Sequence, residues 1–228
     1  MTHIGGDPLG IPPNWTFDDK DVAVRFDEHV RGQLPWYDFA SEITCELCRG
    51  FIPNGAIVYD IGAGTGNMGL RLAQTVHDRN VTLIGIEPSL EMISTQHRRA
   101  DCYSEMINMP VESVELKQMD VALSFLTIMF MPVAIRKQFL ADLFWNVRPG
   151  GCMILLERFQ NPHPYLNTLY SRIGWRMKYE CNSKEGIVDK ELSLSGIQRP
   201  LAMSELPRGA VEYFRSGDFA GYIWVKQP

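Results

Sequence analysis

The sequence lacks the features that mark membrane, secreted and nucleic-acid-binding proteins. Its 228 residues contain no apolar run of about twenty residues, and charged side chains recur through the first thirty positions. We therefore expect no signal peptide, no membrane contact and a cytoplasmic location. The formal net charge of −5 argues against a nucleic-acid partner, because phosphate binding needs a basic face. The local basic group Arg172, Arg176 and Lys178 is interpreted as a solvated helix face.

Residues with metal-ligating spacing are also scarce. The chain has five cysteines, of which Cys45 and Cys48 form a C-x-x-C pair, but no second pair or histidine pair completes a zinc site. The five histidines, at positions 3, 29, 77, 97 and 163, show no ligand spacing either. We therefore predict no metal site, and we expect core cysteines in a reducing compartment.

What the chain does contain is an alternation of strand-like and helical segments after residue 53. The expected strands are Ile57–Ile61, Val81–Ile86, Val121–Ile128 and Cys152–Leu156, with a weaker one at Cys102–Met106. The expected helices are Met68–His77, Ser89–Arg99, Val133–Asn146 and Tyr165–Tyr179. This pattern predicts an α/β fold with a doubly wound, Rossmann-like, mostly parallel sheet. A hairpin of Ala210–Phe214 and Tyr222–Val225 around Gly217 would add an antiparallel C-terminal strand.

The residues before this domain predict a separate helical cover. Residues 1–14 are expected to form a flexible arm. A first helix, capped by Thr16 or Asp18, would present an apolar face, and a second would run from about Asp38 to Arg49. The apolar face of the first helix is expected to hold Val22, Val24, Phe26 and Val30. The predicted organisation is an arm and cover over residues 1–52 and one domain over residues 53–228.

A glycine-rich turn, within the stretch VYDIGAGTGN of residues 58–67, follows the first expected strand. A phosphate-binding P-loop is excluded because no Gly-Lys-Ser/Thr ending is present. The dinucleotide fingerprint G-x-G-x-x-G fails because its third place is Asn67. What remains is Asp60 followed by Gly62, Gly64 and Gly66. That pattern suits a ligand without a pyrophosphate, lying across the carboxyl end of the strand.

Two carboxylates end neighbouring strands at this crevice. Asp60 is expected to orient the turn or, through water, to bind an ammonium group. Glu87 is expected to accept both hydroxyls of a ribose, and each charge-assisted hydrogen bond contributes about 1.5–3 kcal/mol. An acidic crevice of this kind favours a cationic adenosyl ligand.

The motifs as a set resemble the class I S-adenosylmethionine-dependent methyltransferases. The resemblance rests on Asp60 with GAGTG, then IGIEPS, VALSFLT and RPGGCMILLE, over roughly residues 55–160. It implies S-adenosylmethionine as the cofactor, with Pro88 and Met92 near the adenine and Asn108 and Met109 at its edge. The cofactor-binding residues expected are Tyr37, Asp60, Gly62, Ala63, Gly64, Gly66, Glu87, Pro88, Met92, Asn108, Met109, Ser124 and Phe125.

A narrower resemblance links the chain to the carboxy-S-adenosylmethionine synthases of tRNA wobble-uridine modification. It rests on NWTFDDKDVAVRFDEHVRGQLPWY and RKQFLADLFWNVRPGGCMILLERF. Such enzymes make a carboxylated cofactor from prephenate, and Tyr37 matches a tyrosine that contacts their ligand. The chain departs from them in having Lys190-Glu191 where the family's loop has, after a lysine, an arginine that binds the added carboxylate. A glutamate at this place is expected to repel a carboxylate, and Arg199, eight residues on, could substitute only if the loop is rearranged. The chain also has Ser124-Phe125 in place of a strand-four asparagine, and only Met203–Gly209 in place of a helix.

These observations predict an S-adenosylmethionine-dependent methyltransferase, a transferase acting on an unidentified small-molecule acceptor. Two alternatives stay open: a carboxy-S-adenosylmethionine synthase-like enzyme using prephenate, and a non-catalytic cofactor-binding scaffold. A cavity that is open beside the cofactor would favour an enzyme, whereas one sealed by Tyr37 and Phe125 would favour the scaffold. No catalytic residue is assigned, and a homodimer stays open.

Overall fold

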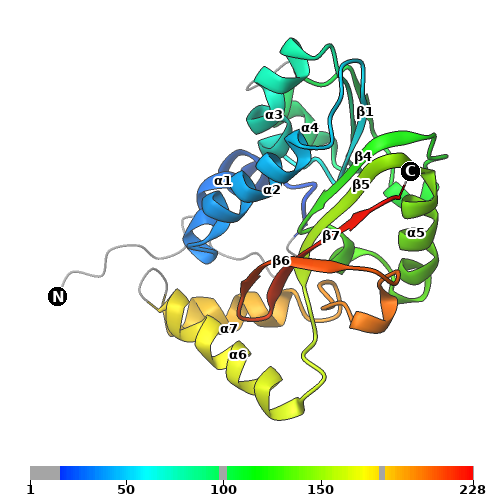
Figure 1. Ribbon diagram of the computed structural model, residues 1–228. Coiled ribbons are helices and arrows are strands. Elements are labelled where there is room, and N and C mark those ends of the chain that lie inside the picture. The colour runs from blue at the N-terminus through cyan, green and yellow to red at the C-terminus, as the bar shows by residue number, and fades with distance from the viewer. Residues whose placement is uncertain (1–15, 98–101, 180–182, 228) are drawn as a thin grey trace.

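The computed structural model describes residues 16–97, 102–179 and 183–227, and these form a seven-stranded sheet flanked by helices (Figure 1). The strand order is β3-β2-β1-β4-β5-β7-β6, with β1 to β5 parallel and β7 antiparallel to both β5 and β6. The strands are β1 (Ile57–Ile61), β2 (Thr82–Ile86), β3 (Glu105–Ile107), β4 (Met119–Phe125), β5 (Val147–Arg158), β6 (Val211–Ser216) and β7 (Phe219–Val225). This order confirms the predicted Rossmann-like sheet with its antiparallel C-terminal hairpin.

Helices cover both faces of the sheet, so the fold is doubly wound. In Figure 1, α1 and α2 lie on one side of the sheet, α5 lies on the other, and α6 and α7 lie below. The α-helices are α1 (Lys20–Gln33), α2 (Tyr37–Arg49), α3 (Asn67–Asp78), α4 (Leu90–His97), α5 (Val133–Asn146), α6 (Pro164–Lys178) and α7 (Lys184–Ser193). Short 3₁₀ turns occur at η1 (Val111–Ser113), η2 (Ile128–Phe130) and η3 (Met203–Glu205).

Two hydrophobic cores, one on each face, hold the layers together. The core on the α5 side includes Leu140, Leu143 and Trp224, whereas the core on the α2 and α3 side includes Cys45, Cys48 and Leu72. Both cysteines are free and fully buried, and burial raises the pKa of the Cys45 thiol to about 12. The expectation of core cysteines is confirmed. Across residues 16–97, 102–179 and 183–227, no cluster of His, Cys, Asp or Glu has the geometry of a metal site.

Several expected boundaries differ from the structure for local reasons. The first helix begins after Asp19, whose side chain accepts the backbone N–H groups of Asp21 (2.8 Å) and Val22 (3.1 Å), so neither Thr16 nor Asp18 is the cap. Val24 was expected on the apolar face of this helix, but it is 45% exposed, because the buried face follows a spacing of three and four residues from Val22.

Two further differences lie along β4 and β5. The fourth strand ends at Phe125 rather than at Ile128, because Leu126 adopts a positive φ of 60° and the chain turns into η2. The strand expected at Cys152–Leu156 extends back to Val147 and forward to Arg158. It therefore includes the Arg-Pro-Gly-Gly segment of residues 148–151, which lies between the expected helix and the expected strand.

The segment after α6 also departs from expectation. Lys190 and Glu191 were placed in a loop, but they lie on α7, whose N-cap Ser183 accepts the backbone N–H of Gly186 at 3.0 Å. Only the three residues of η3 are helical between Met203 and Gly209, in line with the predicted loss of a crossover helix. The arm at residues 1–14 and the end of the helix expected to reach Arg99 lie outside the described residues.

The sheet order places one edge of the molecule at a topological switch point. From β1 the chain proceeds outward to β2 and β3, and it then returns to β4 on the other side of β1. In open α/β sheets ligands bind outside the carboxyl ends of the strands at such a reversal. No described helix is both long and apolar enough to cross a bilayer.

Candidate functional site

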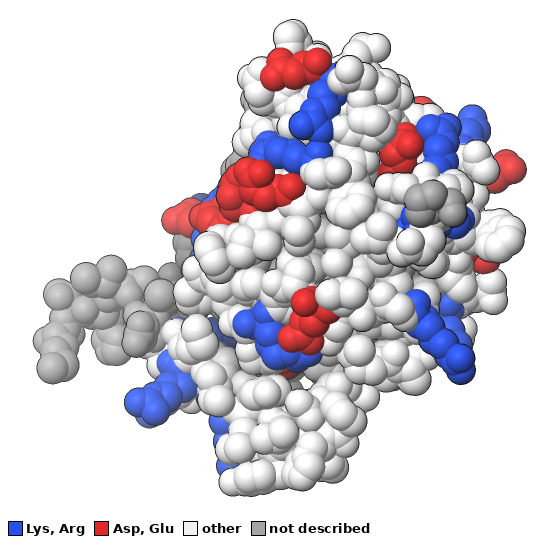
Figure 2. Space-filling view, viewed as in Figure 1, with Lys and Arg blue, Asp and Glu red and all other residues white. Residues whose placement is uncertain are grey.

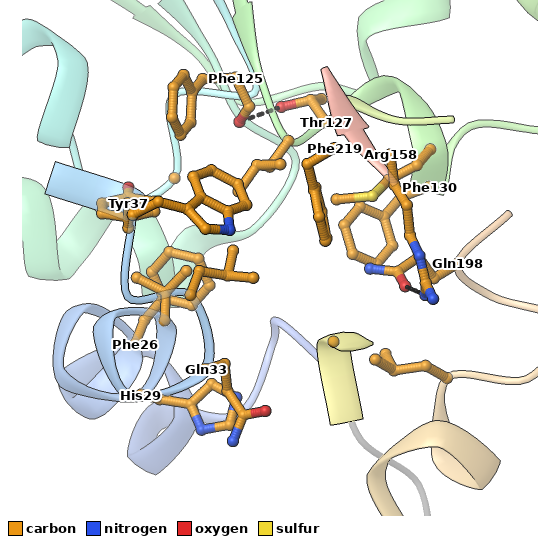
Figure 3. A pocket seen from close by; sticks show the side chains of 18 of the residues that line it. Phe26, His29, Gln33, Tyr37, Phe125, Thr127, Phe130, Arg158, Gln198 and Phe219 are labelled. Atoms are coloured by element: carbon orange, nitrogen blue, oxygen red, sulfur yellow. Dashed lines mark hydrogen bonds between the residues drawn. The ribbon is translucent and has the colours of Figure 1, made fainter. Parts of the chain in front are cut away.

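A cavity of about 290 Å³ lies at this switch point. Its size is near the lower end of the range for small-ligand pockets, about 300–1,000 Å³. Its walls come from α1, the α1–α2 connection, the glycine turn, the loop after β4, helices α6 and α7, and the β6–β7 turn. In Figure 3, Tyr37 and Phe26 lie on one side of the open space and Phe219 and Phe130 on the other.

The glycine turn forms one wall of the cavity, and its three glycines have different surroundings. All three have positive φ values: 73° at Gly62, 55° at Gly64 and 81° at Gly66. A Cβ at Gly62 would lie 2.2 Å from Thr127 Oγ1, and one at Gly66 would lie 2.6 Å from Gln96 Cγ. A Cβ at Gly64 would meet only a carbonyl oxygen at 3.9 Å. The first and third glycines therefore permit close packing, whereas the middle one faces open space.

Glu87 connects the end of β2 to the glycine turn. One oxygen of its carboxylate accepts the backbone N–H of Gly64 at 2.9 Å, and the other accepts the backbone N–H of Ser89 at 2.9 Å. Burial raises the pKa of this carboxyl, although the two backbone hydrogen bonds act in the opposite direction. The side chain therefore fixes the turn, and it also lines the cavity.

Asp60 lies beneath the turn and is absent from the cavity wall. Its Oδ2 accepts a hydrogen bond from the Tyr103 hydroxyl at 2.6 Å, and the Tyr103 oxygen accepts the backbone N–H of Gly69 at 3.2 Å. Burial raises the pKa of Asp60 to about 6. This placement fits the first of its two expected roles, in which Asp60 orients the turn.

Eight of the thirteen expected cofactor-binding residues line the cavity: Tyr37, Gly62, Ala63, Gly64, Glu87, Pro88, Met92 and Phe125. The other five do not: Asp60, Gly66, Asn108, Met109 and Ser124. Asn108 supports the wall from behind, since its side-chain amide donates to the carbonyls of Glu87 (3.0 Å) and Pro88 (2.7 Å). Met109 is 43% exposed, away from the cavity.

Tyr37 and Phe125 form an edge-to-face pair, with ring centroids 5.4 Å apart. Burial raises the pKa of the Tyr37 hydroxyl to about 12, and the Arg31 guanidinium lies over its ring at 5.5 Å. The two rings stand in the cavity wall and do not close it, because the same cavity continues to α6 and α7. By the criterion set from the sequence, this arrangement favours an enzyme over a scaffold.

Helix α1 is fastened to the glycine turn by Asp27, which the sequence interpretation missed. The Asp27 carboxylate accepts the Thr65 hydroxyl at 2.5 Å and the Asn67 side-chain amide at 2.7 Å. Thr65 and Asn67 flank Gly66 at the start of α3. The N-terminal cover is therefore bonded to the predicted cofactor turn.

Glu157, at the end of β5, organises the loop after β4. Its fully buried carboxylate accepts the backbone N–H groups of Thr127 (2.9 Å), Ile128 (2.8 Å) and Met129 (3.3 Å), and the Ser124 hydroxyl at 3.2 Å. Burial raises the pKa of Glu157 to about 7 despite these donors. Thr127 and Met129 line the cavity, so Glu157 positions part of its wall. Its place at a strand end was visible in the sequence, but its partners were not.

The far end of the cavity holds charged residues whose places differ from the sequence interpretation: Arg158 was not assigned, and Lys178, interpreted as part of a solvated helix face, lines the cavity with its side chain only 16% exposed. Arg158 donates to Asp218 at 2.5 Å, and Lys178 pairs with Glu191 at 3.2 Å. Glu191 Oε2 also lies 3.9 Å from Arg158. Glu191 was expected to repel a carboxylated ligand, but these cations offset its charge, so the repulsion is weaker than its sequence position indicated.

The places of two other residues near this end became clear only from the structure. Arg199, the only arginine that the sequence offered as a substitute for the family's carboxylate-binding residue, is exposed and does not line the cavity. Lys190 Nζ and His29 Nε2 are hydrogen-bonded, which links α7 to α1 across the cavity. Arg158 is the last residue of β5 and lies two positions beyond the expected strand, and this place near a strand end was the signal that could have identified it.

Comparison with known proteins supports the family resemblance predicted from the sequence. The profile of the methyltransferase domain family matches residues 58–151. The carboxy-S-adenosyl-L-methionine synthase of Staphylococcus epidermidis is 26% identical, covering 94% of this chain and 98% of that protein. The enzyme of the same name from an Enterobacter strain is also 26% identical, over 82% of this chain and 76% of its own.

Solved structures show the same fold. A candidate S-adenosyl-L-methionine-dependent methyltransferase from Methanococcus maripaludis has a TM-score of 0.56 at 14% identity, covering 94% of this chain and 95% of that chain. The cyclopropane synthase MmaA2 of Mycobacterium tuberculosis has a TM-score of 0.54 at 12% identity, and the match covers 75% of this chain and 61% of that chain. The resemblance expected from the sequence is confirmed.

Proposed function

We propose that this chain, an enzyme of the S-adenosylmethionine-dependent methyltransferase superfamily with S-adenosylmethionine as its cofactor, methylates a small-molecule acceptor. The observation that carries the proposal is the continuity of one cavity from the glycine turn to α6 and α7. Cofactor and acceptor sites in one enclosed space are what a direct group transfer needs, because the reacting atoms must meet in line.

The residues at the glycine-turn end fit an adenosyl cofactor. Gly64 leaves space where any side chain would project, Glu87 presents a carboxylate, and Met92 and Pro88 supply apolar surface. When bound, S-adenosylmethionine supplies an electrophilic methyl group on a positively charged sulfonium. We assign Glu87 to the ribose hydroxyls, and Gly62 to Gly64 to close backbone contact with the cofactor.

The chain's own contribution to the chemistry is alignment and exclusion of water. Asp27 holds α1 on the turn, Glu157 fixes the loop that carries Thr127, and the Tyr37–Phe125 pair forms an aromatic part of the cavity wall. Holding reactants in a near-attack arrangement lowers the barrier by about 7–11 kcal/mol in favourable cases. We assign no general base.

Calorimetric titration with S-adenosylmethionine and S-adenosylhomocysteine, together with mass spectrometry of co-purifying small molecules, tests the proposal. We expect saturable binding of both compounds at one site. A folded protein that binds neither compound would refute the cofactor assignment. Methyl transfer is then followed as release of S-adenosylhomocysteine in the presence of an acceptor panel.

A second candidate function is carboxylation of the cofactor with prephenate, as in the carboxy-S-adenosylmethionine synthases. The alignment over nearly the whole chain favours it, as do Arg158 and Lys178 at the cavity wall, which are cations suited to a carboxylate. Incubation with S-adenosylmethionine and prephenate would then yield a product heavier than the cofactor by one carboxyl group. We rank it second because both cations already have carboxylate partners in Asp218 and Glu191.

A further inference from the structure

Helix α6 presents an apolar stripe to the cavity, and the described part of the chain leaves this stripe largely exposed. Tyr170, Ile173, Gly174 and Met177 line the cavity, and their spacing of three and four residues places them on one face of the helix. Helix α6 has no buried residue, and Ile173 and Met177 remain 49% and 42% exposed. Amphipathic helices normally gain most of their stability by burying such a stripe. The space beside it is therefore shaped for an apolar occupant.

The opposite wall of this space is aromatic. Phe219, at the start of β7, packs against Trp36 with ring centroids 5.0 Å apart, and both residues line the cavity. Phe130, from the loop after β4, lies on the same side as Phe219 in Figure 3. A molecule between Phe219 and Ile173 would contact an aromatic ring on one side and an aliphatic side chain on the other.

The charged groups at this end already have partners within the protein, and Lys190, which also lines the cavity, is hydrogen-bonded to His29. Arg158 is bonded to Asp218, and Lys178 is bonded to Glu191, which also faces Arg158. An anionic ligand would have to displace a carboxylate from Arg158 or Lys178, or His29 from Lys190, and a cationic ligand would have to displace an arginine or a lysine. Burying an ion without a partner costs several kcal/mol. The visible surface over α6 is mostly uncharged as well (Figure 2).

We propose that the space between α6 and Phe219 is the acceptor subsite, and that it takes an uncharged, apolar molecule with a ring system. The inference rests on the proposed function, since it places the cofactor at the glycine-turn end of the same cavity. It goes further by naming the chemical class of the acceptor and the residues that select it, chiefly Ile173, Met177 and Phe219.

The test uses three ring compounds of one shape and different charge: 2-naphthol, 2-naphthoate and 2-naphthylmethylammonium. Each is titrated by calorimetry into the full-length protein saturated with S-adenosylhomocysteine at neutral pH. We expect 2-naphthol to bind about tenfold or more tightly than either charged probe. Ile173→Asp should weaken binding of 2-naphthol about tenfold, because it places a charge in the apolar wall. Met177→Asp, a second variant of the same stripe, should do the same.

Leu192→Asp is the matched control, since Leu192 is an exposed apolar residue of α7 that does not line the cavity. Tighter binding of naphthoate than of naphthol, equal effects of Ile173→Asp and Leu192→Asp, or no binding of naphthol would each overturn the inference. Saturation with S-adenosylhomocysteine is measured first. If the protein does not bind S-adenosylhomocysteine, the result counts against the proposed function. If it binds S-adenosylhomocysteine but not 2-naphthol, the result counts against this subsite alone.

Discussion

Substitution of Gly64 by alanine separates ligand contact from backbone strain more cleanly than any other change in the glycine turn. Gly64 has a φ of 55°, and a Cβ built on it would meet no protein atom closer than 3.9 Å. The same change at Gly62 would drive the Cβ into the Thr127 side chain, so loss of binding there would be confounded by damage to the fold.

The magnitude follows from two separate costs. An alanine in the left-handed region is strained by roughly 1–2 kcal/mol, which lowers stability but does not by itself oppose the ligand. If the cofactor lies against Gly64, the added methyl group crowds it, and overpacking of a well-fitted site costs typically about 1–3 kcal/mol. Since 1.4 kcal/mol is tenfold in affinity, binding of S-adenosylhomocysteine should weaken about five- to hundredfold.

Gly55→Ala provides the matched control, because Gly55 has a φ of 71°, no atom within 4 Å of its built Cβ, and a place away from the cavity. Thermal unfolding should show similar losses of stability for the two variants. Calorimetric titration with S-adenosylhomocysteine should show a weaker dissociation constant for Gly64→Ala alone. Equal affinities in the two folded variants would refute the assignment of the turn to the cofactor.

Three further predictions concern the carboxylates of Glu87, Asp27 and Glu157. Glu87→Gln should weaken S-adenosylhomocysteine binding about tenfold, the scale of one charge-assisted hydrogen bond. An effect no larger than that of Glu112→Gln, at an exposed position, would exclude Glu87 as the residue that binds the ribose hydroxyls. Asp27→Asn should speed hydrogen exchange in residues 20–33 and weaken ligand binding several-fold, because a neutral amide accepts more weakly from Thr65 and Asn67; the same result from Asp21→Asn, on the exposed side of α1, would contradict it. Burial raises the pKa of Glu157 from 4.5 to about 7, so the native state holds its proton longer than the unfolded chain, and this group's contribution to stability falls as pH rises from about 4.5 to 7. In the wild type, this group should lower the free energy of unfolding by up to about 3 kcal/mol between pH 4.5 and 7, and Glu157→Gln should remove that part of the decrease. The free energy of unfolding is measured by chemical denaturation at each pH. Parallel pH profiles for wild type and variant would show that the pKa of Glu157 is not raised.

The sequence alone determined the sheet and the end of it at which the cavity lies. Short apolar runs alternating with helical segments are local patterns, and the parallel sheet follows from them because each crossover helix must return the chain to the same edge. The turn at Gly62 to Gly66 was equally local, since positive φ is a property that glycine carries with it. Glu87 was placed by its position at a strand end.

Only the tertiary structure decided which side chains support and complete that site. Asp27 reaches Thr65 across 38 positions of the chain, and Glu157 reaches Ile128 across 29. No periodicity within either segment encodes such a pairing. The neighbours of Glu191 were equally hidden in the sequence, and its charge taken alone indicated that it would repel an anion. In the folded chain Lys178 and Arg158 approach it to 3.2 and 3.9 Å, and the sign of the local field depends on all three charges together.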